Sequence, residues 1–201
     1  MKKPTPNAQR TEAMRAKLIR AARMLFVDKG FAETSTPDIV KLAEVTRGAL
    51  YHHFADKTDL FRAVVRQEFE LIAKEINTQA IGAQGDALAA LMAGTHAYLE
   101  TMRAPGRVRL LLQDAPAVLS RAELDQMDLD TSGASLKQGL AAVLEATGRT
   151  DLRAEALAPL VSAMFDRAAL DVSQGASEAD CYAVFEWLFT QLCAPPDGRS
   201  V

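Results

Sequence analysis

The chain has 201 residues, and 49% of them are hydrophobic, so it can bury a substantial core as one domain or as a small domain plus a larger one. No stretch approaches 18 uncharged apolar residues, and no apolar core follows the basic N-terminus MKKPTPNAQR. We therefore expect neither a membrane span nor a signal peptide, and a cytoplasmic protein.

The formal net charge of −3 conceals an uneven distribution of charge along the chain. Residues 1–66 contain thirteen Lys or Arg and seven Asp or Glu, a net charge of +6. Residues 67–201 contain ten and nineteen, a net charge of −9. This division predicts a polyanionic partner for the first third of the chain only.

Apolar residues recur at spacings of three and four through most of the chain, which predicts an all-α fold. A first helix runs from Thr11 to Gly30, and Phe31 supplies the apolar contact that often follows a helix-ending glycine. After the segment 34–57, a long helix extends from Asp56 to about Ala80. Gly82–Gly85 forms a turn, and a short helical segment from Pro105 ends near Asp114–Pro116. The other expected helices are 87–102, 135–146, 153–173 and 178–192; residues 120–133 are left unassigned.

The stretch Thr34–Lys57 predicts two short helices joined by a tight turn. In the first, Thr36 is the expected N-cap and Pro37 the first helical residue. In the second, Thr46 is the N-cap, and Leu50 and Phe54 anchor one face. These apolar residues should share a small core with the first helix, composed of Leu18, Phe26, Phe31, Ile39, Leu50 and Phe54.

The other face of the second short helix is unusual for a solvent-exposed helix. It carries a cation, a glycine and three rings capable of hydrogen bonding, which suits the major groove of DNA: Arg47, Gly48, Tyr51, His52 and His53. Arg47 and Lys57 each follow an expected N-cap, where a cation is disfavoured by roughly 0.3–1 kcal/mol unless an anion such as phosphate is bound there. Either side chain alone could instead point into solvent.

Catalytic and metal-binding patterns are not found in the sequence. Cys181 and Cys193 lie twelve residues apart on one expected helix, about 18 Å, so we interpret them as free thiols. His52, His53 and His96 do not form a ligand set, and no nucleophile, base and orienting group stand out. We therefore expect a protein that is not an enzyme and has no metal or other cofactor.

The run TRGALYHHFADKTDLF, with FVDKGFAETS before it, closely resembles the DNA-binding domain of TetR/AcrR-type transcriptional regulators. The resemblance covers residues 12 to about 72. The arm before these residues (1–11) contains two prolines and shows no apolar periodicity, so we expect it to be flexible and basic; Lys2, Lys3 and Arg10 could reach phosphates, or the arm could simply be disordered. The resemblance implies a helix-turn-helix (35–54) within a DNA-binding domain (12–72). A helical ligand-binding and dimerisation domain (73–194) and a disordered tail (195–201) follow.

The same resemblance implies roles for individual residues. Arg47, Gly48, Tyr51 and His52 match positions near bases or adjacent phosphates, and Thr36, Thr46, His53 and Lys57 match phosphate-contacting positions. Glu44 departs from the pattern, because the family usually has Gly in this turn. A left-handed conformation there would cost Glu about 1 kcal/mol and bring a negative charge near the DNA.

The resemblance also implies a homodimer that leaves a palindromic operator when a small molecule enters the C-terminal domain. By analogy with the family, the candidate pocket residues are Phe69, Ile72, Tyr98, Leu99, Met102, Leu111 and Phe165, although each of them taken singly fits an ordinary core residue better.

Apolar stripes on the last two expected helices predict a two-fold dimer through a four-helix bundle. The candidate interface residues are Leu157, Leu160, Val161, Met164, Val184, Phe185, Leu188, Phe189 and Leu192, although these stripes could instead face their own domain. Another class of function stays open, a helical ligand-binding or interaction module in which the helix-turn-helix is only architecture. That alternative does not predict the basic first third.

Overall fold

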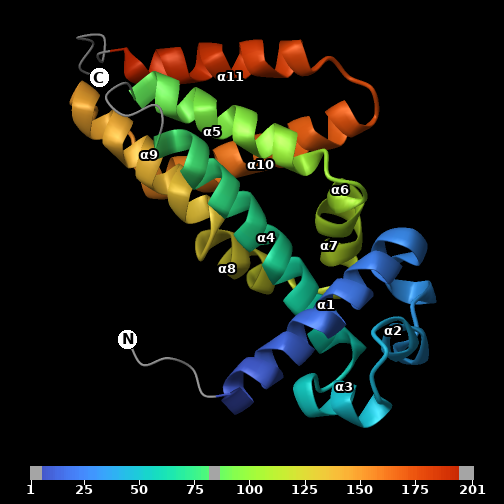
Figure 1. Ribbon diagram of the computed structural model, residues 1–201. Coiled ribbons are helices and arrows are strands. Elements are labelled where there is room, and N and C mark those ends of the chain that lie inside the picture. The colour runs from blue at the N-terminus through green and yellow to red at the C-terminus, as the bar shows by residue number, and fades with distance from the viewer. Residues whose placement is uncertain (1–5, 82–86, 195–201) are drawn as a thin grey trace. The chain divides into compact units, whose positions relative to one another are not determined.

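The computed structural model describes residues 6–81 and 87–194 (Figure 1). Within these ranges the chain forms helices and no strand, so the prediction of an all-α fold is confirmed. In chain order the elements are α1 (Pro6–Glu33), α2 (Thr36–Leu42), α3 (Arg47–His53), α4 (Lys57–Ile81), α5 (Ala87–Met102), α6 (Arg107–Arg109), the π-helix η1 (Leu110–Asp114), α7 (Ala115–Val118), α8 (Arg121–Leu129), α9 (Ser132–Thr147), α10 (Ala154–Ser173) and α11 (Glu178–Cys193).

Parts of the predicted domain layout fall wholly or partly outside the described residues. The predicted turn at 82–85 and the predicted tail at 195–201 lie wholly outside them. The predicted arm lies partly outside them, including Lys2 and Lys3. The rest of the predicted arm, from Pro6 to Thr11, belongs to α1 instead. A proline is tolerated in the first turn of a helix because no intrahelical partner is available for an N–H there, so Pro6 does not prevent this longer helix.

The chain divides into two compact units. Unit 1 comprises Met1–Glu68 and Pro105–Arg121, and unit 2 comprises Phe69–Ala104 and Ala122–Val201. The sequence instead predicts a boundary near residue 72, with residues 105–121 in the second domain. Helix α4 is continuous across the first boundary, as predicted.

Unit 1 has the small aromatic core that the sequence predicts. Leu18, Phe26, Ile39, Leu50 and Phe54 are buried. The half-buried Phe31 contributes from the rim of this core, because its ring lies 5.8 Å from Phe26 and 4.9 Å from Phe61, measured between ring centroids. Gly30 has a φ of 81°, which interrupts α1 and turns the chain so that Phe31 reaches these rings.

The segment Pro105–Arg121 joins unit 1 through close contact with α1. Gly106 has a φ of 73°, and a Cβ placed on it would lie 2.3 Å from Val27 Cγ1, so only glycine fits. The helical run that follows does not end near Asp114–Pro116 as predicted but continues to Val118. Pro116 falls in the first turn of α7, directly after the π-helical turn, where a missing N–H is tolerated.

A buried cluster of charged side chains also holds this segment to unit 1. The carboxylate of Glu68, only 1% exposed, accepts hydrogen bonds from Arg23 Nε and Arg107 Nε, both at 2.6 Å. Burial alone would raise the pKa of Glu68, but the two guanidinium groups outweigh it and hold the pKa below its ordinary value. The cluster thus connects α1, α4 and α6 within unit 1.

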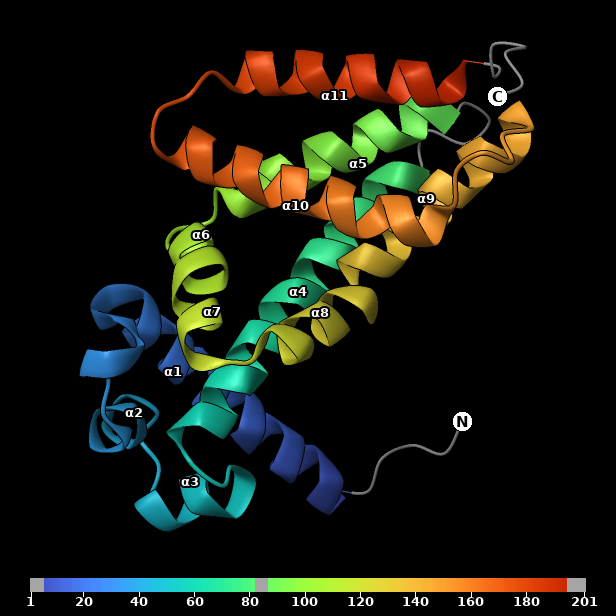
Figure 2. The ribbon, with the colours of Figure 1, turned by 180° about the vertical axis from the view of Figure 1, so that it is seen from behind.

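Unit 2 is a bundle in which α5 packs against α9, α10 and α11 (Figures 1 and 2). Its core contains a row of aromatic rings, since Phe165 lies 4.4 Å from Phe185 and 5.3 Å from Tyr98 between centroids. The previously unassigned residues 120–133 form α8 and the start of α9. Among the helices that the structure describes, none is both long and apolar enough to cross a membrane.

Candidate nucleic-acid interface

Helix α2 begins one residue earlier than the sequence analysis placed it. Ser35, not Thr36, is the N-cap, and its Oγ accepts a hydrogen bond from Asp38 N at 3.2 Å. Ser35 Oγ also lies 2.8 Å from the Asp38 carboxylate, so the two side chains close the end of the helix together. Two hydroxyl residues precede Pro37, and local sequence did not distinguish them. The difference leaves the Thr36 hydroxyl available for another contact.

The turn between α2 and α3 has a helix-ending geometry that normally calls for glycine. Val45 N donates to Val40 O at 3.0 Å and Glu44 N to Lys41 O at 3.1 Å, which is the hydrogen-bond pair of a Schellman motif. Glu44 occupies its left-handed position with a φ of 49°, the one non-glycine residue with positive φ among those described. Its exposed carboxylate lies 3.5 Å from Lys17 Nζ of α1.

Replacing Glu44 with glycine is expected to stabilise the protein by about 0.5–1 kcal/mol, because it relieves the left-handed strain and loses only an exposed ion pair. The paired variant Glu44→Gln keeps the strain and removes the charge. We expect Glu44→Gln to leave the unfolding midpoint in urea unchanged but to tighten DNA binding at low salt, as Glu44→Gly should too. Equal midpoints for Glu44→Gly and the wild type would contradict the strain argument.

Helix α3 has one buried and one exposed face, as predicted. Thr46 Oγ1 accepts a hydrogen bond from Ala49 N at 3.1 Å, which confirms it as the N-cap. Leu50 and Phe54 are buried and fix the helix against α1, where the Arg15 guanidinium also lies 4.5 Å from the centroid of the Phe54 ring. On the opposite face, the predicted contact residues Arg47, Gly48, Tyr51 and His52 are exposed, and His53 is half-buried.

The exposed residues Arg47 and Tyr51 form a cluster with the half-buried Thr36. The Arg47 guanidinium lies 5.4 Å from the centroid of the Tyr51 ring, and the Tyr51 hydroxyl is hydrogen-bonded to the Thr36 side chain. The hydrogen bond to Thr36, followed by the interaction with Arg47, lowers the pKa of Tyr51 below its ordinary value. The cluster therefore joins the start of α2 to the exposed face of α3 and presents hydrogen-bond donors from both helices.

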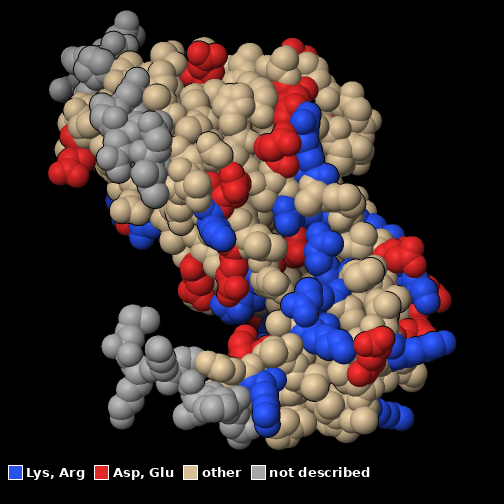
Figure 3. Space-filling view, viewed as in Figure 1, with Lys and Arg blue, Asp and Glu red and all other residues tan. Residues whose placement is uncertain are grey.

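His52 and His53 complete the exposed end of α3, with ring centroids 5.2 Å apart. Lys and Arg side chains are prominent on the surface of unit 1 in Figure 3, in agreement with the positive charge of residues 1–66. Among the residues that the structure describes, no group of three or more His, Cys, Asp or Glu could hold a metal ion.

Lys57 occupies a position that sequence reasoning did not anticipate. Its Nζ donates to Phe31 O and Thr34 O, both at 2.9 Å, and lies 4.2 Å from the centroid of the Phe31 ring. The ammonium group thus caps carbonyl groups at the end of α1. No local sequence signal could reveal this role, because the acceptors lie more than twenty residues away in the chain.

The Lys57→Met variant is expected to lose about 1–3 kcal/mol of stability, because the partly buried carbonyl groups of Phe31 and Thr34 lose a charged hydrogen-bond donor. Lys41→Met, on an exposed side chain of α2, should change stability by less than about 0.5 kcal/mol. Urea unfolding measures both. A second measurement tests the predicted phosphate contact: if Lys57 also binds phosphate, the slope of log K against log salt should fall by about one.

The candidate pocket residues are divided between the two units. Ile72, Tyr98, Leu99, Met102 and Phe165 are buried in unit 2, and Phe69 is half-buried there, whereas Leu111 is buried in unit 1. The Tyr98 hydroxyl donates to Asp166 Oδ1 at 2.7 Å. Burial, followed by the charge of Asp166, raises the pKa of Tyr98 well above its ordinary value. Tyr98 and Asp166 therefore form a polar pair beside the aromatic rings of unit 2.

The candidate interface residues on α10 and α11 separate into buried and exposed groups. Val161, Phe185, Phe189 and Leu192 are buried in unit 2, so they pack mainly within their own unit and not on its surface as the prediction assumed. Both helices are apolar on more than one face, so periodicity alone did not show which face their own unit covers. Leu160, Met164 and Val184 are exposed, and Leu157 and Leu188 are half-buried.

The fold of unit 1 and the exposed face of α3 together define a helix-turn-helix protein with a second, helical unit. Comparison with protein families agrees, since residues 18–64 match the model described as bacterial regulatory proteins, tetR family. Residues 88–193, more than half of the chain, match the model described as tetracyclin repressor-like, C-terminal domain. The chain belongs to the TetR family of bacterial regulatory proteins.

Individual relatives match shorter parts of the chain. The transposon Tn10 TetC protein of Escherichia coli is 31% identical over 113 residues, 56% of each chain. The transcriptional regulator TtgR of Pseudomonas putida is 42% identical over 57 residues, 28% of this chain and 27% of its own. The chain thus spans about half, or less, of the length of these curated relatives.

A solved structure matches more completely. A TetR-family transcriptional regulator from Pectobacterium atrosepticum superposes with a TM-score of 0.69 at 28% identity and covers 94% of this chain and 95% of its own. The similarity therefore extends through both units.

Proposed function

We propose that this protein is a DNA-binding transcriptional regulator, a repressor that binds a palindromic operator as a homodimer, and not an enzyme. The observation that carries the proposal is the pair Arg47 and Tyr51, which is exposed on α3, contacts Thr36 at the start of α2, and lies opposite the face of α3 that is buried in the core of unit 1. A side chain that recognises the edge of a DNA base must be held in a fixed position, and a helix anchored in the core holds its exposed hydrogen-bond donors in this way. The positive charge of residues 1–66 supplies attraction to phosphates.

Binding to DNA upstream of the protein's own gene tests this proposal. With a fluorescently labelled fragment and anisotropy as the readout, we expect binding that weakens steeply as salt rises from 50 to 200 mM, since several phosphates are neutralised. An unrelated fragment of equal length should bind far more weakly at every salt concentration. If the helix-turn-helix were only architecture, as in the alternative of a ligand-binding or interaction module, neither fragment would bind.

A dimer follows from the geometry of DNA. Two recognition helices must reach successive major grooves about 34–36 Å apart, and a fixed dimer sets that spacing. The exposed apolar side chains of α10 and α11, Leu160, Met164 and Val184, support these helices as the dimer surface. The buried residues Val161, Phe185, Phe189 and Leu192 support this surface indirectly, because they hold α10 and α11 in place within unit 2.

A small molecule bound in unit 2 completes the proposed function by releasing the DNA. The hydrogen-bonded pair Tyr98 and Asp166, beside Phe165, supports an effector with an aromatic or apolar body and a polar group. A thermal-shift screen tests it, because a ligand that binds the folded state raises the unfolding temperature. A true effector should also weaken DNA binding, and DNA should weaken effector binding by the same factor.

A further inference from the structure

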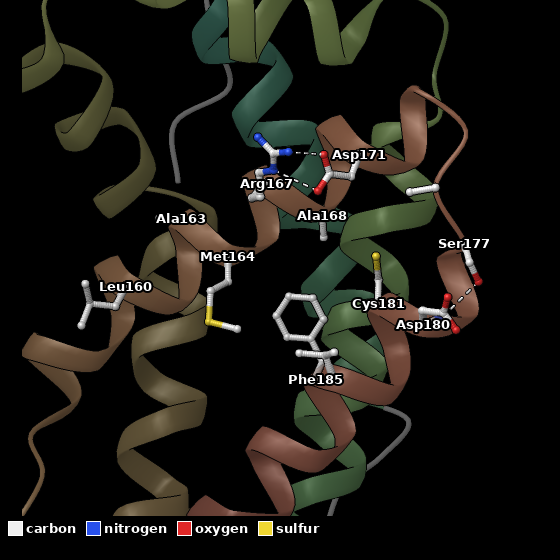
Figure 4. Close-up of a pocket in the computed structure, with 12 residues that line it drawn as sticks. Leu160, Ala163, Met164, Arg167, Ala168, Asp171, Ser177, Asp180, Cys181 and Phe185 are labelled. Carbon is white, nitrogen blue, oxygen red and sulfur yellow. Dashed lines mark hydrogen bonds and ion pairs between the residues drawn. The ribbon is translucent and has the colours of Figure 1, made fainter.

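A groove of about 500 Å³ lies between α10 and α11 on the surface of unit 2 (Figure 4). Leu160, Ala163 and Met164 line it from α10, and Cys181 and Val184 line it from α11. Figure 4 shows Met164 directed across the groove toward Phe185, whose buried ring closes the far side. The groove is therefore mainly apolar.

The charged residues of the groove are already compensated. Arg167 NH2 lies 2.7 Å from Asp171 Oδ1, and the two form an i,i+4 ion pair at one end of the groove. Asp180 lies in the first turn of α11, where the helix dipole favours a carboxylate. The exposed positions of α10 from Ala156 to Met164 carry no charge. These charges favour an uncharged, apolar occupant.

Next to the groove, the same surface carries a large side chain in contact with water. Trp187 is 64% exposed and lies one turn beyond Val184 on α11, outside the lining of the groove. Leu160 and Val184, which line the groove, are 67% and 53% exposed. An exposed tryptophan next to a groove with exposed aliphatic side chains is typical of a protein–protein interface and not of an ordinary surface.

We propose that Trp187 of each of two copies of this chain enters the α10–α11 groove of the other copy. One pair of helices presents both an apolar groove and a projecting ring, so the surface is complementary to itself. In a two-fold interface every such contact is made twice, and the two insertions occur together. The proposal rests on the proposed homodimer and names the side chain that anchors it.

The fluorescence of Trp187 reports the insertion directly, because the chain has a single tryptophan. The full chain is diluted in steps while light scattering gives its mass and emission spectra are recorded. We expect a blue-shifted emission and protection from acrylamide quenching at concentrations where the mass is that of a dimer. Both should disappear together as the monomer forms.

Two variants test the projecting ring and the groove separately. Trp187→Ala removes the ring, and Ala163→Leu fills the groove from an exposed position without touching the core. Each should raise the dimer dissociation constant at least tenfold with an unchanged helical circular dichroism spectrum. Leu129→Ala, at an exposed leucine on α8, is the matched control and should leave the constant unchanged.

The outcomes separate this inference from the proposed function. A wild-type protein that stays monomeric at all concentrations overturns the proposed dimer and the insertion together. A dimer with unshifted emission, or one that Trp187→Ala leaves intact, overturns the anchor and retains the dimer. A protected Trp187 with normal dimerisation of Ala163→Leu shows that the ring is buried outside the groove, which overturns its placement.

Discussion

Replacing Arg107 with methionine is expected to lower the free energy of unfolding by about 3–5 kcal/mol, the cost of removing one partner of a buried ion pair. Glu68 is only 1% exposed, and Arg107 is its more deeply buried partner. Without Arg107, the carboxylate retains only the hydrogen bonds from Arg23. Urea unfolding at neutral pH measures the loss.

The pH dependence identifies the cause of this loss. The pKa of Glu68 in the folded protein is below its ordinary value, so the stability that Glu68 contributes is present above its unfolded pKa. That contribution disappears as the pH falls through the lowered folded pKa, where the carboxyl group is protonated in both states. The difference between Arg107→Met and the wild type should therefore shrink as the pH is lowered through this range.

Two further variants complete this experiment. Adding Glu68→Gln to Arg107→Met should recover part of the lost stability, because the uncompensated charge is then absent. Lys137→Met breaks an exposed ion pair with Glu155 and should cost less than about 1 kcal/mol. If Arg107→Met cost no more than Lys137→Met at every pH, the buried cluster would have no structural importance.

The second large effect concerns the exposed face of α3. We expect Arg47→Ala and Tyr51→Ala each to weaken operator binding by about 1–3 kcal/mol, because each removes hydrogen-bond donors from the exposed face that we propose to contact DNA. Neither side chain supports the core, so the unfolding midpoint should stay within about 0.5 kcal/mol of the wild type. Anisotropy with operator and non-operator fragments at one salt concentration measures both affinity and specificity.

Tyr51→Phe refines this test, since it keeps the ring over which Arg47 lies and removes the hydroxyl bonded to Thr36. An intermediate loss of affinity would assign part of the effect to the hydroxyl. Leu71→Ala, at an exposed leucine of α4 in unit 2, should bind operator as the wild type does. A folded Arg47→Ala/Tyr51→Ala double variant with unchanged affinity would refute the docking of α3 on DNA.

The sequence by itself determined most of the helices and the exposed face of α3. Helix positions follow from apolar periodicity and end signals, which act within a few residues: Thr46 caps α3, and Gly30 interrupts α1. Leu50 and Phe54 fix the buried face of α3 and thereby its exposed face, because residues four apart share one side of a helix. These features needed no knowledge of distant residues.

The tertiary structure alone decided which distant groups meet. Lys57 reaches the carbonyl groups that end α1, and Arg107 reaches Glu68. Periodicity shows that α10 and α11 are apolar, but only packing decides that Phe185 is buried and Trp187 exposed. The physical reason is that helix formation depends on near neighbours, whereas burial and ion pairing depend on contacts that the folded chain creates.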